Sequence, residues 1–266
     1  MANQGYTNFF LSNTVEDQFN SHLDLQKFFK VDDSLVGTAG MQRIIHAYRA
    51  TNGTERLGKG EGNTKSIEVS YTPVEYNIAL AQNRFVWRDE DAMEDPMIVP
   101  VGMKHAGTDM FNTVQADIYS ELESTSTTVS VNKLDFDAFV DALAKLNLET
   151  GENKNVFCFV NPIYTAALRK NLKDDLKYIE DYARTGYIGT VAGVNIYTKK
   201  DAGFVIVATA DAVTLFVKKG VEVEQITQGT RSETAANVRE NTVFTRKYYF
   251  AALTDETKAV KMIIPD

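Results

Sequence analysis

Hydrophobic residues recur at helical spacing through the middle of the chain. They lie three or four residues apart at Met103, Ala106, Met110, Val114, Ile118 and Leu122. This spacing is typical of one buried face of an α-helix. Pro96 or Pro100 suits a first helical turn, and the acidic residues of 89–95 favour a helix start. The pattern therefore predicts a long helix over about residues 99–124.

The segment before this helix has a β pattern. Residues 41–51 and 65–88 are rich in β-branched and aromatic residues, and Ile67–Tyr71 alternates between apolar and polar positions. The intervening residues 52–63 are glycine-rich and charged, which is typical of a flexible tip. We therefore expect a long β-hairpin over Met41–Arg88. A ribbon of this length cannot bury both faces on one small core, so it is expected to project and to need a partner.

The second half of the chain alternates between helical and strand patterns. Hydrophobic spacing predicts a helix over about 133–147, and Asn161 followed by Pro162 predicts the capped start of a helix ending near Leu172. Strands are expected at 155–160, 194–197, 204–209, 221–226, 242–253 and 259–264. Thr254–Thr257 is interpreted as a hairpin turn between the last two strands.

The first 35 residues are interpreted as an arm. They are polar but carry aromatic anchors at Tyr6, Phe9, Phe10, Phe19, Phe28 and Phe29. Val15, Phe19 and Leu23 follow near-helical spacing, which predicts an amphipathic helix over about 13–30. Aromatic residues on such a segment need a surface to pack against, either on the chain's own body or on a neighbour.

Composition is ordinary for a soluble globular protein, with 44% hydrophobic and 24% charged residues among 266. The net charge of −8 argues against strong nucleic-acid binding without a segregated basic patch. Cys158 lies in an apolar run and is expected to be a buried, inert thiol. The polar start lacks signal-peptide features, and no apolar run is long enough for a membrane helix, so folding in a cytoplasm is expected.

The residues that most often bind metals are scattered. His22, His46 and His105 lie far apart in different predicted elements, without a zinc-binding spacing. The acidic residues of 89–95 do not have the spacing of a calcium-binding loop. No metal site is therefore predicted.

Two glycine clusters resemble nucleotide-binding loops only superficially. The glycines of 58–62 have the wrong spacing for a dinucleotide fingerprint, and no helix is predicted after them. Those of 186–193 lack a phosphate-binding lysine and lead into a strand, which favours a tight turn. No cofactor and no catalytic residue is predicted, and the chain is not expected to be an enzyme.

Four strings, in their order along the chain, resemble the major capsid proteins of tailed bacteriophages that share the HK97 fold. The strings are Leu134–Leu143, Phe159–Lys170, Ile188–Tyr197, and Tyr248–Ala252 followed by Ala259–Val260. The resemblance covers about residues 40–264 and implies an α+β fold. It implies an N-terminal arm (1–40), an extended E-loop hairpin with flanking strands (41–88), a P-domain spine helix with a linker (89–130), an A-domain (mainly 131–220), and P-domain return strands with a C-terminal β segment (221–266).

The resemblance also implies a function. The chain would be a structural subunit that assembles as pentamers and hexamers into an icosahedral shell around double-stranded DNA, without sequence-specific binding. It would form in the bacterial host cytoplasm, reside in the virion and contact no membrane. A separate scaffolding protein is expected, because only about 35 residues precede the hairpin. A portal and a possible decoration protein are the other expected partners.

Within this interpretation, the charged residues at and near the hairpin tip are predicted to contact neighbouring subunits. They are Arg49, Glu55, Arg56, Lys59 and Glu61. Plain solubility is the other explanation for charges at these positions. Lys59 and Lys65 lie where some relatives form a covalent cross-link, but here they are expected to be ordinary solvated lysines.

Three other interpretations stay open at this point. An encapsulin-type nanocompartment shell would have the same architecture but hold protein cargo. A small α/β enzyme or ligand-binding protein would use the loop at 186–193 and form a discrete small oligomer. The third is another virion component, such as a tail tube or decoration protein; the long predicted helix argues against a tube protein, which is mainly β.

Overall fold

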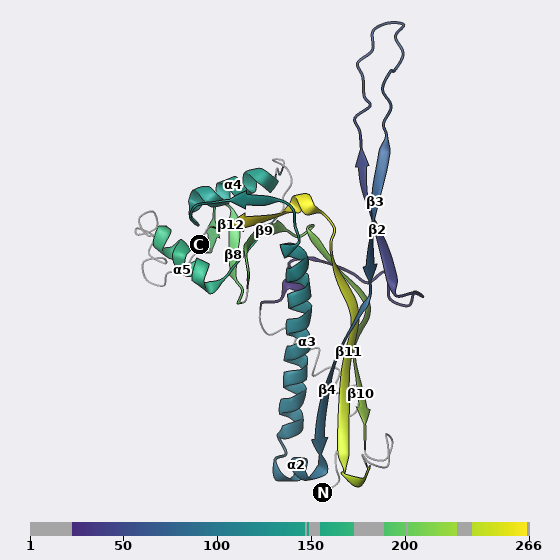
Figure 1. Cartoon of the computed structure of the whole chain (residues 1–266), viewed down its shortest axis with the longest axis vertical. Coiled ribbons are helices and arrows are strands. Elements are labelled where there is room, and N and C mark those ends of the chain that lie inside the picture. The colour runs from purple at the N-terminus through teal and green to yellow at the C-terminus, as the bar shows by residue number, and fades with distance from the viewer. Residues whose placement is uncertain are drawn as a thin grey trace. The chain divides into compact units, whose positions relative to one another are not determined.

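The structure is a computed structural model, and it describes residues 23–146, 148, 155–172, 189–200, 202–227 and 236–264. The chain divides into two units, which are treated separately below. One is the hairpin unit, residues 39–78; the other, the body, contains the rest of the chain (Figure 1).

The first sheet of the body has four strands in the order β1 (Lys30–Asp32), β10 (Val213–Ile226), β11 (Glu240–Leu253) and β4 (Ala79–Arg88). β10 and β11 are long antiparallel partners, with register shifts between Val217 and Glu222. β11 also pairs with all of β4, and β1 adds to the other edge in parallel. The predicted hairpin strand over 65–88 is therefore two strands, because its second half pairs with β11 instead of with the hairpin.

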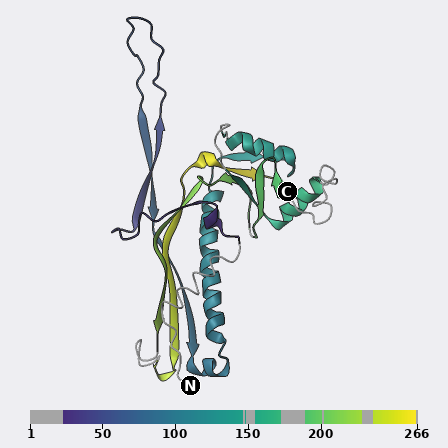
Figure 2. The same ribbon diagram turned by 180° about the vertical axis from the view of Figure 1, so that it is seen from behind.

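A long helix, α3 (Ile98–Glu123), packs along this sheet, as both ribbon views show (Figures 1 and 2). The helix predicted over 99–124 is thus confirmed. Met103 and Met110 pack with Trp87 and Val243 of the sheet. Gly102 permits close approach here, because a Cβ at this position would lie 2.2 Å from the Phe85 ring.

The acidic residues that were expected to start α3 instead form a separate short helix, α2 (Asp89–Glu94). The Asp91 carboxylate accepts a hydrogen bond from the Arg88 backbone N–H at 3.0 Å, which caps α2. The acidic residues therefore do begin a helix, as predicted, but this helix is α2 and not α3.

The second sheet of the body has six strands. Its order is β5 (Thr128–Ser130), β12 (Ala259–Ile263), β9 (Val205–Thr209), β6 (Val156–Val160), β8 (Val194–Thr198) and β7 (Thr190–Val191). α4 (Phe136–Leu146) and α5 (Pro162–Asn171) share a core with it. As predicted, Asn161 caps α5, since its side chain accepts a hydrogen bond from the Ile163 N–H at 3.0 Å.

The central strand β6 is buried on both faces, which explains its continuous apolar sequence. Phe157 and Phe159 point into a core shared with α3 and the first sheet. Val156, Cys158 and Val160 point into the core shared with α4. Burial raises the pKa of the Cys158 thiol, in line with its expected inertness.

Two predicted turns have different outcomes. β11 and β12 belong to different sheets, so the predicted hairpin turn at Thr254–Thr257 is wrong; a short 3₁₀ helix, η2 (Glu256–Lys258), carries the chain between the sheets. The glycine-marked turn after Gly189 is confirmed as a β7–β8 hairpin, in which Ala192 and Gly193 have φ of 49° and 83°. Positive φ at both central residues is typical of a type I′ turn. Gly186 lies outside the described residues.

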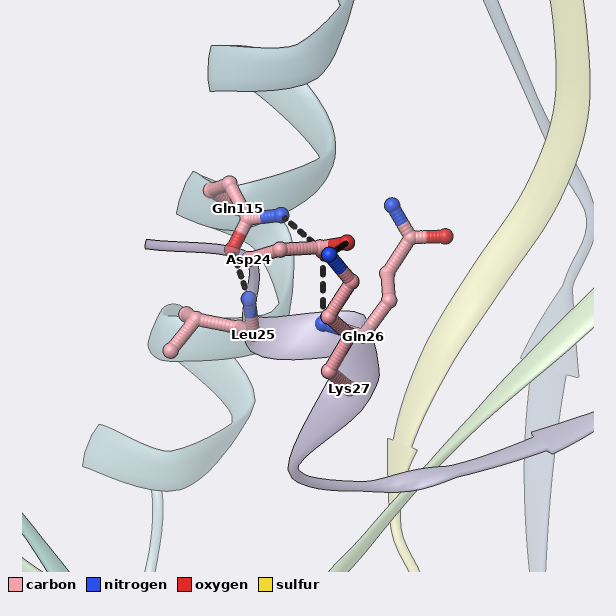
Figure 3. Close-up of polar contacts among 5 residues, drawn as sticks. All are labelled: Asp24, Leu25, Gln26, Lys27 and Gln115. Atoms are coloured by element: carbon pink, nitrogen blue, oxygen red, sulfur yellow. Dashed lines mark hydrogen bonds and ion pairs between the residues drawn. The ribbon is translucent and has the colours of Figure 1, made fainter. Parts of the chain in front are cut away.

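Hydrogen bonds join the described part of the N-terminal segment to α3 (Figure 3). Gln115 of α3 accepts a hydrogen bond from the Leu25 N–H at 2.7 Å and donates one to Asp24 Oδ1 at 3.2 Å. Asp24 also caps a 3₁₀ turn, η1 (Leu25–Lys27). The helix predicted over 13–30 is therefore wrong from residue 23 onward, and residues 1–22 lie outside the described part of the chain.

Replacing Gln115 with leucine is expected to loosen this attachment. Gln115 and Asp24 are both buried, so the substitution leaves the Leu25 N–H without its acceptor. Such a loss typically costs about 1–3 kcal/mol. Urea unfolding of the purified subunit should show this decrease, and Thr113→Leu, an exposed substitution on the same helix, serves as the control. Equal stability of the two variants would contradict the role of Gln115.

Candidate subunit interface

The hairpin unit is a two-stranded antiparallel ribbon. β2 (Gln42–Ala50) pairs with β3 (Val69–Asn77) in unbroken register from Gln42 opposite Asn77 to Ala50 opposite Val69. The Ile78 N–H also donates to the Met41 carbonyl at 2.7 Å, which closes the base of the ribbon. The predicted hairpin is confirmed over this span.

The two faces of the ribbon differ in polarity. Residues paired across the strands share a face, and faces alternate along each strand. One face, called here the apolar face, carries Ile44, His46, Val69, Tyr71 and Pro73. The opposite face is mixed, because it carries the polar Arg43, Ser70 and Thr72 together with the apolar Ile45 and Val74; the apolar face itself has the polar Gln42 and Glu75 only near its base.

The apolar face is exposed. The exposed fractions of Ile44, Val69 and Tyr71 are 48%, 63% and 60%. The His46 and Tyr71 rings stack at 4.9 Å, which groups the aromatic surface but does not bury it. An isolated two-stranded ribbon is marginally stable in water, and a continuous exposed apolar surface marks an interaction site. The ribbon therefore has the composition of a surface that another protein covers.

The tip of the ribbon is organised by Glu55. Its carboxylate accepts hydrogen bonds from the Thr64 N–H and the Thr64 hydroxyl, both at 2.7 Å, and a longer one from the Lys65 N–H at 3.4 Å. These donors lower the pKa of Glu55, the Thr64 hydroxyl first among them. Glu61 similarly accepts from the Gly58 N–H at 2.8 Å.

Replacing Glu55 with alanine is expected to speed backbone hydrogen exchange at Thr64 and Lys65, because both N–H groups lose their acceptor. A lowered pKa means that the ionised carboxylate orders the tip. This contribution is present above the ordinary carboxyl range and is lost as pH falls through the lowered pKa. Arg56→Ala is the matched control in hydrogen-exchange mass spectrometry at neutral pH. Unchanged exchange at Thr64 in the Glu55 variant would count against the network.

The structure places four of the five predicted contact residues in the tip, with different surroundings. Glu55 and Glu61 are engaged within the loop, whereas the structure gives Arg56 and Lys59 no ion pair with any residue it describes. Arg49 lies in β2 opposite Ser70, and its side chain lies outside the described residues. Contact of these residues with a neighbour stays a prediction. Sequence reasoning missed the apolar face, although the alternation at Ile67–Tyr71 signals it.

The residues that the structure describes contain no cluster of histidine, cysteine or acidic side chains arranged to hold a metal ion. His46 lies in β2 and His105 in α3, while His22 lies outside the described residues. Among the helices that the structure describes, none has the length and hydropathy needed to cross a bilayer.

A ribbon with an exposed apolar face, a long helix along a four-stranded sheet, and a second sheet that shares its core with two helices together define the HK97 fold of viral shell proteins. The solved structures agree with this class. The chain matches the capsid of Ralstonia phage GP4 with a TM-score of 0.69 and 8% identity, over 90% of this chain and 88% of that one. It matches a virus-like particle from Pyrococcus furiosus with a TM-score of 0.63 and 14% identity, over 95% and 97% of the two chains.

A sequence comparison also finds a similar protein. The chain is 24% identical over 264 residues to the major capsid protein of Staphylococcus phage phiMR11, covering 95% of this chain and 91% of the relative. No protein-family model matches the chain. The chain therefore has the HK97 fold and is similar in sequence to a phage major capsid protein.

Proposed function

We propose that copies of this chain form pentamers and hexamers that close into an icosahedral shell around double-stranded phage DNA. The observation that carries the proposal is the apolar face of the ribbon, which is exposed in the single chain. A neighbouring copy that covers this face converts an aggregation hazard into a specific contact. The charged tip residues, Arg56 and Lys59 among them, would lie at the end of that contact.

The domain layout is part of the proposal. The β1-β10-β11-β4 sheet with α3 would be the peripheral P-domain, and the six-stranded sheet with α4 and α5 would be the axial A-domain. Because β4 pairs with β11 along its length, Ala79–Arg88 fits the P-domain better than the E-loop. The E-loop would then be the hairpin unit, residues 39–78.

The chain would act without catalysis and without a cofactor. Its net charge of −8 would leave packaged DNA unattached to the wall, because phosphates are repelled by an acidic surface. Assembly in the host cytoplasm, a separate scaffolding protein, a portal and a possible decoration protein complete the proposal.

Expression of the full chain, alone and with candidate scaffolding proteins, tests this function. Negative-stain microscopy and sedimentation should reveal closed particles of uniform diameter. Particles recovered from infected cells should contain double-stranded DNA. A protein cargo in place of DNA would instead support a nanocompartment shell, and only small discrete oligomers under all conditions would overturn the shell assignment.

A further inference from the structure

A groove of about 850 Å³ runs along α3 in the body. Its floor is formed by residues at steps of four along the helix: Thr108, Asn112, Ala116 and Ser120. Twelve residues of α-helix span about 18 Å, so the floor is long enough for several residues of another segment. The short side chains at these positions leave the hollow, while Phe111 and Tyr119 supply apolar walls.

The N-terminal segment enters this groove. Leu23, the first residue that the structure describes, lines the groove, and so does Leu25. Val15, Phe19 and Leu23 are spaced four residues apart, so Leu23 is the last member of an apolar stripe that begins outside the described residues. Since one member of the stripe already lies in the groove, the others start within reach of it.

The charges at the groove and on the segment are complementary. Lys199 and Lys200 line the groove. Glu16 and Asp17 lie within the apolar stripe, between Val15 and Phe19. The acidic groove residue Glu123 is engaged within the body, because it accepts a hydrogen bond from the Gly203 N–H at 3.2 Å.

We propose that residues 13–22 bind in this groove of their own chain, with Phe19 on the floor over Ala116 and the acidic pair facing the two lysines. The Leu25–Gln115 hydrogen bond anchors the chain only a few residues away. A tether this short gives an effective concentration in the millimolar range, which favours the chain's own segment over a neighbour's. This binding does not depend on shell formation, so it is tested on unassembled subunits as well as on particles.

Disulfide trapping tests the placement. Phe19→Cys is combined in turn with Asn112→Cys, Ala116→Cys and Ser120→Cys, and mild oxidation is followed by denaturing gels without reductant. The native Cys158 is buried and does not compete. A disulfide needs Cα atoms within about 7 Å, so at least one pair should form an intrachain link at monomer mass with loss of both thiols. Phe19→Cys with Thr113→Cys is the control, because Thr113 is exposed on α3 but does not line the groove.

Two results would overturn the proposal. Disulfide-linked dimers as the main product would assign the groove to a neighbour's segment. Linking no better than the Thr113 control at all three positions would mean that residues 13–22 bind elsewhere.

Groove filling provides an independent measurement. Ala116→Trp, or Phe19→Ala if the first variant folds poorly, should increase the rate of backbone hydrogen exchange within residues 13–22 by about tenfold, since exchange follows the open population. Unchanged exchange in both variants would contradict docking. Particles that fail to form while intrachain linking persists would instead count against the shell function alone.

Discussion

Subunits with Val69 and Tyr71 both replaced by aspartate are expected to fold normally and to form no closed shells. Both side chains are exposed in the single chain, at 63% and 60%, so the body loses no core contact. If a neighbouring copy covers the apolar face, burying the exposed three fifths of these two side chains contributes about 2–4 kcal/mol per contact. Desolvating two new carboxylates adds to the loss.

The same strand provides the matched control. Ser70→Asp with Thr72→Asp adds the same two charges to the same strand, but on the opposite face of the ribbon. Circular dichroism should show that both double variants are folded, and sedimentation should show particles only for the control. Particles from the Val69 and Tyr71 variant in normal yield would remove the apolar face from the interface.

Phe159→Ala is expected to destabilise the body more than any single change to the ribbon. Phe159 is fully buried in β6, and its ring lies 5.5 Å from those of Phe28 and Phe157. Truncating a buried phenylalanine typically costs about 3–5 kcal/mol. Against a typical total of 5–15 kcal/mol for a folded domain, this is a large fraction.

Urea unfolding of the purified subunit measures this effect. Phe136→Ala is the control, because Phe136 lies on α4 with 50% of its side chain exposed and should change stability by well under half as much. Similar unfolding midpoints for the two variants would show that the core around β6 is not what holds the body together.

Sequence reasoning succeeded where local signals govern the structure. The apolar repeat from Met103 to Leu122 fixed α3 to within a residue at each end, and Asn161 with Pro162 marked the start of α5. The hairpin at Gln42–Asn77 followed from β-branched and aromatic residues on both sides of a glycine-rich tip. Four of the five charged residues predicted at or near the tip lie in this loop, whereas Arg49 lies in β2.

The errors arose where contacts between residues far apart in the sequence determine the secondary structure. Val15, Phe19 and Leu23 predict a helix through residue 30, but Phe28 packs its ring against Phe157 and Tyr197, and Lys30–Asp32 pairs with β10. Similarly, β11 and β12 follow each other closely in sequence yet join different sheets, which no local turn signal reports. The apolar face was missed because it is formed by residues of both strands, and the sequence does not show which residue of β3 lies opposite which residue of β2.

The double burial of β6 restricts how this chain can vary. Inserting or deleting one residue within Val156–Val160 would exchange the side chains of both cores at once, because neighbouring positions serve opposite faces. Substitutions here can preserve one core while altering the other, but length changes cannot. Length differences between related chains are thus expected in the loops outside β6, which are also the places to attempt insertion of a foreign peptide.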